Sequence, residues 1–139
     1  MKTYTTMHLI KSEDLNHHGT MFAGRMAEWF VEACFIAAAD TVNSPKSIVC
    51  LQIHGLNFGS PAYRGDLLGM EATLVKAGKT SLTVYGTAFR QNNAQAKVVE
   101  GFITFVYVDD DGIKLPHGIV LDETQDPAEL QLRERALKL

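Results

Sequence analysis

Cysteine and proline are scarce in this chain, which has 2 cysteines and 4 prolines in 139 residues. Cys34 and Cys50 do not form a CxxC pair, and both lie among apolar residues. The sequence therefore predicts two buried free thiols in a reducing compartment. No apolar run approaches the roughly 20 residues that a membrane span needs, and the first residues lack the apolar core of a signal peptide. We expect a cytoplasmic protein that does not enter a membrane.

Charge of either sign is also limited. Lys and Arg total 13 against 16 Asp and Glu, for a net charge of −3. This balance argues against nucleic acid as a partner, since phosphate backbones require clustered cations. A GxSxG elbow, a P-loop and a GxGxxG motif are all absent. The adjacent His17 and His18 lack the spacing of helical metal ligands, so no metal site is expected.

What the chain does have is the composition of a globular domain, with 46% hydrophobic and 21% charged residues. We expect one domain over residues 1–139, with a core at about 3–118 and a helical tail at about 122–139. Apolar residues at helical spacing predict a helix from Phe22 to about Val42, ended by the turn at 43–45. Strands are expected at 3–11, 47–58, 66–76, 80–91 and 96–108, with turns at 77–79 and 92–95.

The order strand, helix, four strands predicts an α+β fold. One long helix can cover only one face of a five-stranded antiparallel sheet, by lying in the curve of that sheet. A generic α+β sandwich is the alternative. In either case the sheet edges and the outer helix surface need cover from another subunit.

The most informative stretch runs from Asp14 to Asp40, where a polar loop leads into the long helix. The N–H groups and the positive dipole end at a helix start can stabilise a carbonyl oxygen that gains negative charge. The amide of Asn16 can donate to a carbonyl and accept from a water, although a turn or cap role is equally compatible. Glu28 and Glu32 follow on the helix. Each is a candidate general base. Alternatively, Glu28 is an ordinary exposed helix residue and Glu32 is a structural acid at a subunit interface.

The residues from Asn16 to Trp29 (NHHGTMFAGRMAEW) resemble the N-x-x-G-x-x-F/H-G-G loop and helix start of hotdog-fold acyl-CoA thioesterases, in particular the cytosolic acyl-CoA hydrolase branch. The segments Pro61–Asp66, Gly78–Ser81 and Phe102–Asp109 continue the resemblance, which covers roughly residues 5–118. It implies the hotdog fold, a curved antiparallel five-stranded sheet wrapped around one long central helix, here with a short C-terminal helix. It also implies a homodimer that assembles further into a hexamer or tetramer.

The resemblance implies a reaction as well: hydrolysis of acyl-CoA thioesters to free acid and CoA. Water would attack without a metal at a site shared between two subunits, and CoA would enter only as part of the substrate. Asn16 matches the family's loop asparagine. The family's helix acid matches Val31, so Glu32, or alternatively Glu28, would replace it. A non-hydrolytic acyl-CoA-binding protein is the second hypothesis, and a different reaction in the same cleft, such as dehydration, is the third.

The candidate site consists of two sets of residues. The catalytic set is Asn16 and Glu32. The substrate-binding set is His18, Gly19, Ala23, Gly24, Phe58, Arg64, Lys79, Thr80 and Ser81. Ser60 stands where many relatives have Arg or Lys before a proline, so Arg64, Lys79 or Arg90 would have to bind the CoA phosphates.

Overall fold

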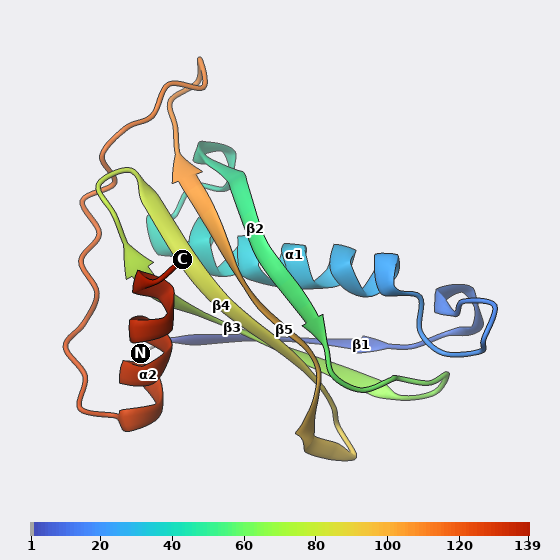
Figure 1. Ribbon diagram of the computed structural model, residues 1–139. Helices are drawn as coiled ribbons and strands as arrows, with labels where there is room; N and C mark the ends of the chain where they lie inside the picture. The colour runs from blue at the N-terminus through green and yellow to red at the C-terminus, as the bar shows by residue number, and fades with distance from the viewer. Residues whose placement is uncertain (1) are drawn as a thin grey trace.

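The structure, a computed structural model, describes residues 2–139. Five strands form one antiparallel sheet in the order β1-β3-β4-β5-β2, so β1 and β2 are its edges (Figure 1). The strands are β1 (Thr3–Leu9), β2 (Ile48–Phe58), β3 (Leu67–Ala77), β4 (Ser81–Arg90) and β5 (Asn93–Tyr107). Helix α1 (Ala23–Val42) crosses one face of the sheet, and helix α2 (Pro127–Leu137) packs on the other. This is the hotdog arrangement expected from the sequence.

The core lies between α1 and the sheet. Met26, Phe30, Cys34 and Ala37 recur at helical spacing and are buried against it. The helix packs tightly on Gly86 of β4, where an added Cβ would lie 2.7 Å from both the Cys34 Sγ and the Phe30 Cζ. A side chain at position 86 would displace Cys34 and Phe30, so glycine allows these two residues of α1 to pack directly on β4.

A smaller core forms behind the sheet, where Ala136 of α2 packs with Val75, Tyr85 and Phe102. A long segment without regular structure leads from β5 to α2 (Figure 1). The guanidinium of Arg135 lies 5.0 Å above the Phe102 ring and fastens the helix to the sheet. The two cores together hold β3, β4 and β5 from both sides.

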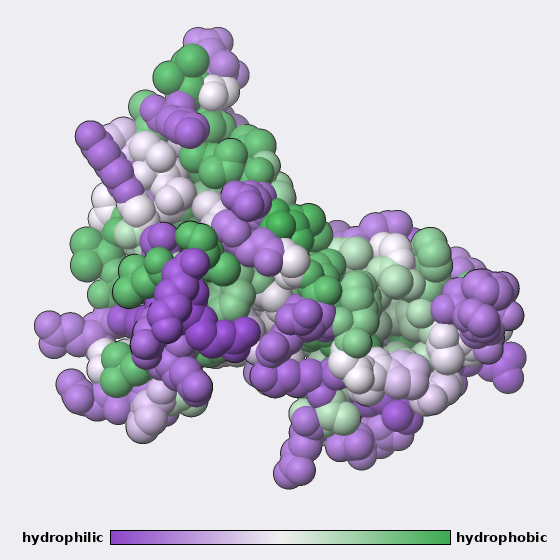
Figure 2. All heavy atoms as spheres, viewed as in Figure 1, coloured by the Kyte–Doolittle hydropathy of each residue, from purple (hydrophilic) through white to green (hydrophobic). Residues whose placement is uncertain are grey.

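Edge strand β2 is open to solvent. Val49, Leu51 and Ile53 are 49%, 55% and 45% exposed, and apolar surface extends over this part of the molecule (Figure 2). Long apolar edge strands are normally covered, because they can pair with other chains. The side of the molecule that carries β2 therefore has the character of an interface.

The structure corrects several details of the sequence prediction. Cys34 is buried as expected, but Cys50 is exposed because it lies on the open edge strand β2. The turn before β5 is earlier than residues 92–95, and β5 already begins at Asn93. Short 3-10 turns at Ser12–Asp14 (η1) and Pro45–Ser47 (η2) were not expected. Within residues 2–139, neither helix combines the length and apolar character that crossing a bilayer requires.

Candidate functional site

Asn16 is at the centre of the loop that leads into α1. Its Oδ1 accepts hydrogen bonds from the N–H of His18, at 2.8 Å, and of Thr20, at 3.3 Å. Its Nδ2 donates to the Thr20 Oγ1 at 3.0 Å and has only a long contact of 3.5 Å with the Met21 carbonyl. Gly19 closes the turn with a φ of +84°, a conformation that suits glycine. The loop thus fixes the orientation of the carboxamide and leaves one N–H weakly engaged.

The half-buried Asn16 lines a cavity of about 300 Å³. Most of its wall is apolar, including Met21, Ala23, Met26, Phe58, Ala62 and Val98. The Ser60 hydroxyl, a polar group at the same cavity, donates to the Lys97 carbonyl at 3.1 Å. An apolar cavity with a few polar groups is the usual form of a site for a small organic ligand.

The start of α1 adjoins this cavity through Ala23. Phe22 precedes the helix and provides no side-chain cap, and the first turn contains no acid. Within the described residues, the backbone N–H groups of Ala23 and Gly24 have no hydrogen-bond acceptor. These donors, together with the positive end of the helix dipole, can receive an oxygen that becomes negative during a reaction.

The outer face of α1 continues from Gly24 as an open groove of about 580 Å³. Ala27, Val31 and Phe35 give the groove its apolar character, and Glu28 and Glu32 are its acids. The carboxylate of Glu28 lies 3.5 Å from the Nη1 of Arg25. Glu32 is exposed and has no ion pair within residues 2–139. Within residues 2–139 the groove therefore presents one carboxylate without an ion pair, and it lies near the middle of α1 rather than at its start.

The structure brings together part of the predicted site. Asn16, Ala23 and Phe58 line one cavity, and His18 and Gly19 belong to its loop. Arg64 is exposed in the neighbouring turn, which joins the loop through a 2.8 Å hydrogen bond from the Met21 N–H to the Ala62 carbonyl.

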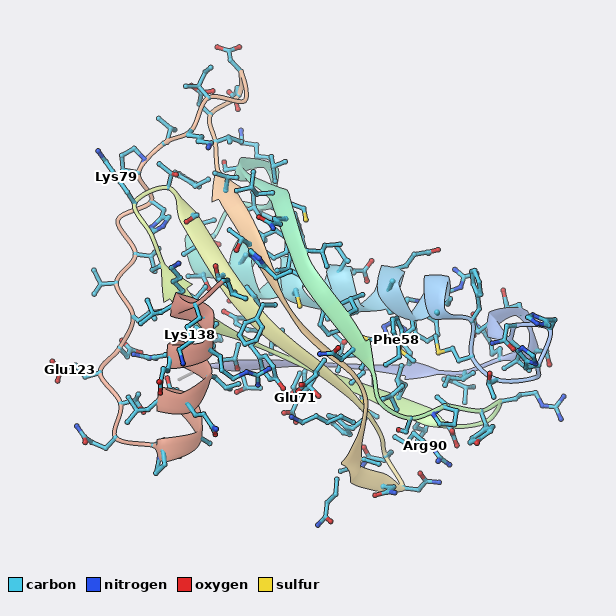
Figure 3. The ribbon with its side chains drawn as sticks, in the orientation of Figure 1. Phe58, Glu71, Lys79, Arg90, Glu123 and Lys138 are labelled. Carbon is cyan, nitrogen blue, oxygen red and sulfur yellow. The ribbon has the colours of Figure 1, made fainter. Side chains whose placement is uncertain are left out.

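Three predicted residues lie elsewhere. Lys79, Thr80 and Ser81 are at the β3–β4 turn, and Figure 3 shows Lys79 at the opposite end of the sheet from Phe58 and Arg90. Within one chain, the hairpin residues therefore do not join the cavity of Asn16.

Two charged residues beside the site were not singled out from the sequence. Asp14 is buried, and its Oδ1 lies 3.3 Å from the Nε of Arg25 on α1. The sequence did contain a signal for this pair. Arg25 is a cation in the first turn of α1, where the helix dipole disfavours positive charge, and such a residue usually pairs with an acid elsewhere. Within residues 2–139 there is no group of three or more potential metal ligands.

Comparison with known proteins identifies the relatives of this chain. The profile of the Thioesterase superfamily matches residues 18–97. An uncharacterised acyl-CoA thioester hydrolase of Zymomonas mobilis is 29% identical over 99 residues, which cover 69% of this chain and 65% of that protein. The match thus spans just under two thirds of that relative's length.

Solved structures extend the similarity to almost the whole chain. An apo-hexameric acyl-CoA thioesterase matches with a TM-score of 0.87 and 29% identity, over 98% of this chain and 86% of the other. The acyl-CoA hydrolase of Staphylococcus aureus, in complex with butyryl coenzyme A, coenzyme A and coenzyme A disulfide, matches with a TM-score of 0.86 and 25% identity. That match covers 98% of this chain and 82% of the Staphylococcus protein.

Proposed function

Because this chain belongs to the thioesterase superfamily, we propose that it hydrolyses acyl-CoA thioesters to a free acid and CoA. The observation that carries the proposal is the meeting of two groups at one cavity. The Asn16 carboxamide and the uncapped start of α1 both adjoin it, and the cavity wall is largely apolar. The names of the relatives, acyl-CoA thioester hydrolase and acyl-CoA thioesterase, support the same reaction.

In the proposed mechanism the thioester carbonyl oxygen lies against the N–H groups of Ala23 and Gly24. Water attacks the carbonyl carbon, and the oxygen becomes an oxyanion that these N–H groups stabilise. The C–S bond then breaks, and CoA leaves as a thiol after receiving a proton. Asn16 holds the carbonyl or the attacking water through its weakly engaged N–H. The reaction uses no metal and no cofactor besides the CoA of the substrate.

We assign the general base to Glu32. Val31 stands at the position of the family's helix acid and cannot accept a proton, so a neighbouring carboxylate has to do so. Glu28 is 3.5 Å from Arg25, whereas Glu32, which lines the same groove, has no ion pair among residues 2–139. Glu32 would take the proton from water and return it to the leaving thiolate.

The proposal includes a second copy of the chain. Asn16 faces the cavity on one side of α1, while Glu32 lies on the open groove on the other. A partner that covers α1 and β2 would bring its own Glu32 to the Asn16 of this chain. We therefore propose a homodimer with shared sites, within a hexamer or tetramer, and the hexameric thioesterase among the similar structures agrees with this assembly.

The phosphates of CoA need cations outside the cavity. Arg64 is exposed beside it, whereas Arg90 is engaged, with its Nε 2.9 Å from an oxygen of Asp66. Lys79, Thr80 and Ser81 can contribute only from another copy of the chain, given their distant location. The free thiols of Cys34 and Cys50 favour a reducing, cytoplasmic setting.

The test is release of free thiol from a panel of acyl-CoAs of different chain lengths. Asn16→Ala and Glu32→Gln should each lower kcat by about 100-fold, the usual loss of an oxyanion donor or a general base. Glu28→Gln is the matched control on the same groove and should stay within about threefold of the wild type. Wild-type rates in all three variants would contradict the site assignment.

A non-hydrolytic acyl-CoA-binding protein is the second candidate, and Val31 is the observation that favours it. In that case calorimetry would detect CoA binding, but no thiol would be released. Val31→Asp should then create hydrolysis in a protein that lacks it, because it places a carboxylate at a half-buried position of the groove that Gly24 also lines. If the wild type already hydrolyses acyl-CoA, this candidate is excluded.

A further inference from the structure

Asp14, two residues before Asn16, is a carboxylate that the proposed chemistry does not use. Its side chain is only 3% exposed. Burial of a carboxylate is costly unless it is paired and hydrogen-bonded. Here one oxygen accepts the Lys11 N–H at 2.8 Å, and the other lies 3.3 Å from the Nε of Arg25. Asp14 thereby connects the turn before the loop to the first turn of α1.

The backbone of Asp14 closes the same loop. Its carbonyl accepts the N–H of Phe22, the residue that precedes the helix, at 2.8 Å. Inside this closure Leu15 and Met21 form a bridge, and the Asn16 N–H donates to the Thr20 carbonyl at 2.8 Å. The entry and exit of the Asn16 loop therefore meet at one residue.

The partner of Asp14 is unusual for its place in a helix. Arg25 is a cation at the positive end of α1, where an acid or a capping side chain would be more favourable. A capping acid, however, would occupy the backbone N–H groups of the first turn. Asp14 pairs with the side chain of Arg25 instead, and the N–H groups of Ala23 and Gly24 have no acceptor in the described part of the chain. The ion pair therefore connects the loop to the helix and leaves the two backbone N–H donors available for the thioester oxygen.

We infer that Asp14 is a positioning residue for the proposed hydrolysis. With Arg25 it holds the Asn16 carboxamide at a set distance from the N–H groups of Ala23 and Gly24. This inference rests on the proposed function, since it concerns groups assigned to the thioester carbonyl. Asp14 itself touches neither substrate nor reacting atoms.

The first experiment compares Asp14→Asn with Asp40→Asn. Asp40 is the control because it is a second carboxylate paired beside an end of α1, where Lys2 at 3.0 Å and Tyr4 at 2.7 Å donate to it. Displacement of a reacting group by about 1 Å can cost about 100-fold in rate, so Asp14→Asn should lower kcat by roughly 10- to 100-fold. KM should change less than about threefold, because the cavity itself is retained. Asp40→Asn should leave both constants unchanged.

A second comparison separates positioning from mere destabilisation. Arg25→Gln should lower kcat as much as Asp14→Asn, and the double variant should lose no more than either single variant. Arg25→Gln also carries the test if Asp14→Asn fails to fold. Independent, multiplying losses would overturn the inference, as would an Asp14→Asn variant with a wild-type kcat.

Hydrogen exchange gives a readout that does not depend on activity. Amides between Leu15 and Met21 should exchange about tenfold faster in Asp14→Asn than in Asp40→Asn if Asp14 fastens the loop. A wild type without any thioesterase activity would refute the proposed function, and equal exchange in the two variants would refute the role of Asp14. If the wild type is active, but Asp14→Asn has the wild-type rate and the same exchange as Asp40→Asn, only the role of Asp14 is refuted and the proposed function stands.

Discussion

The two ends of helix α1 are built in opposite ways. At the C-terminal end Asn43 adopts a left-handed conformation, and its N–H returns to the carbonyls of Ala39 and Asp40. At the N-terminal end Phe22 provides no cap, and the N–H groups of Ala23 and Gly24 have no acceptor within residues 2–139. The terminal backbone groups of the helix are thus capped by hydrogen bonds at the C-terminal end and left uncapped at the N-terminal end. A missing helix cap is typical of a functional site, where some stability of the fold is lost in favour of activity.

The largest effect is expected when the N-terminal end of α1 is given a side-chain cap. Phe22→Asp supplies a side-chain acceptor for the free N–H groups and should raise the free energy of unfolding by about 1 kcal/mol. The same acceptor and its charge should exclude the thioester oxygen and lower kcat by about 100-fold. Urea unfolding and thiol release measure the two effects. Phe22→Leu, which cannot cap, is the control, and a stabilised Phe22→Asp variant with full activity would contradict the proposed use of these N–H groups.

The C-terminal cap of α1, at Asn43, can be weakened by mutation in the same way. Asn43 has a φ of 54°, and a Cβ without a compensating polar group is unfavourable there. Asn43→Ala should therefore cost about 1 kcal/mol of stability, whereas Asn43→Gly should be nearly neutral. Both variants should keep the wild-type kcat. A loss of activity in Asn43→Ala at a temperature where it is folded would mean that the two helix ends are coupled.

The smallest expected effect concerns Asp40 and pH. The hydrogen bonds from Tyr4 and Lys2 hold the pKa of Asp40 below its ordinary value. The folded state therefore gains stability from Asp40 above the ordinary pKa of the carboxyl and loses it as pH falls through the lowered value. The Tm difference between the wild type and Asp40→Asn should be present at about pH 7 and should disappear as the pH falls through the lowered pKa. Because this pair is largely exposed, the difference is small, and high salt should reduce it further.

The sequence predicts the loop and helix of this site well, because both depend on local patterns. Apolar spacing locates α1 to within a residue, and the polar, glycine-bearing stretch before it was expected to be a loop. Properties that depend on sheet order are harder to predict. Cys50 lies in an apolar run and was expected to be buried, but β2 turns out to be an edge. No pattern within a single strand shows whether it has one neighbour or two.

Long-range placement was the second difficulty. Lys79 and its neighbours resemble a substrate-binding turn, yet strand length carries them to the far end of the sheet from Asn16. The pair of Asp14 and Arg25 was missed for a related reason. Charges in polar loops are common, and only the closed loop brings this acid and this guanidinium within 3.3 Å. Whether Glu32 acts as the base stays a prediction, since it depends on how two chains meet.

The open edge of β2 has a practical consequence for anyone who purifies this protein. A lone protomer offers unpaired backbone groups beside exposed Val49, Leu51 and Ile53, and any extended polypeptide can add to such a border. A newly synthesised chain can therefore aggregate through this strand until another polypeptide covers it. Additives that cover apolar surface, or a charged residue placed on this strand, should therefore reduce precipitation during purification.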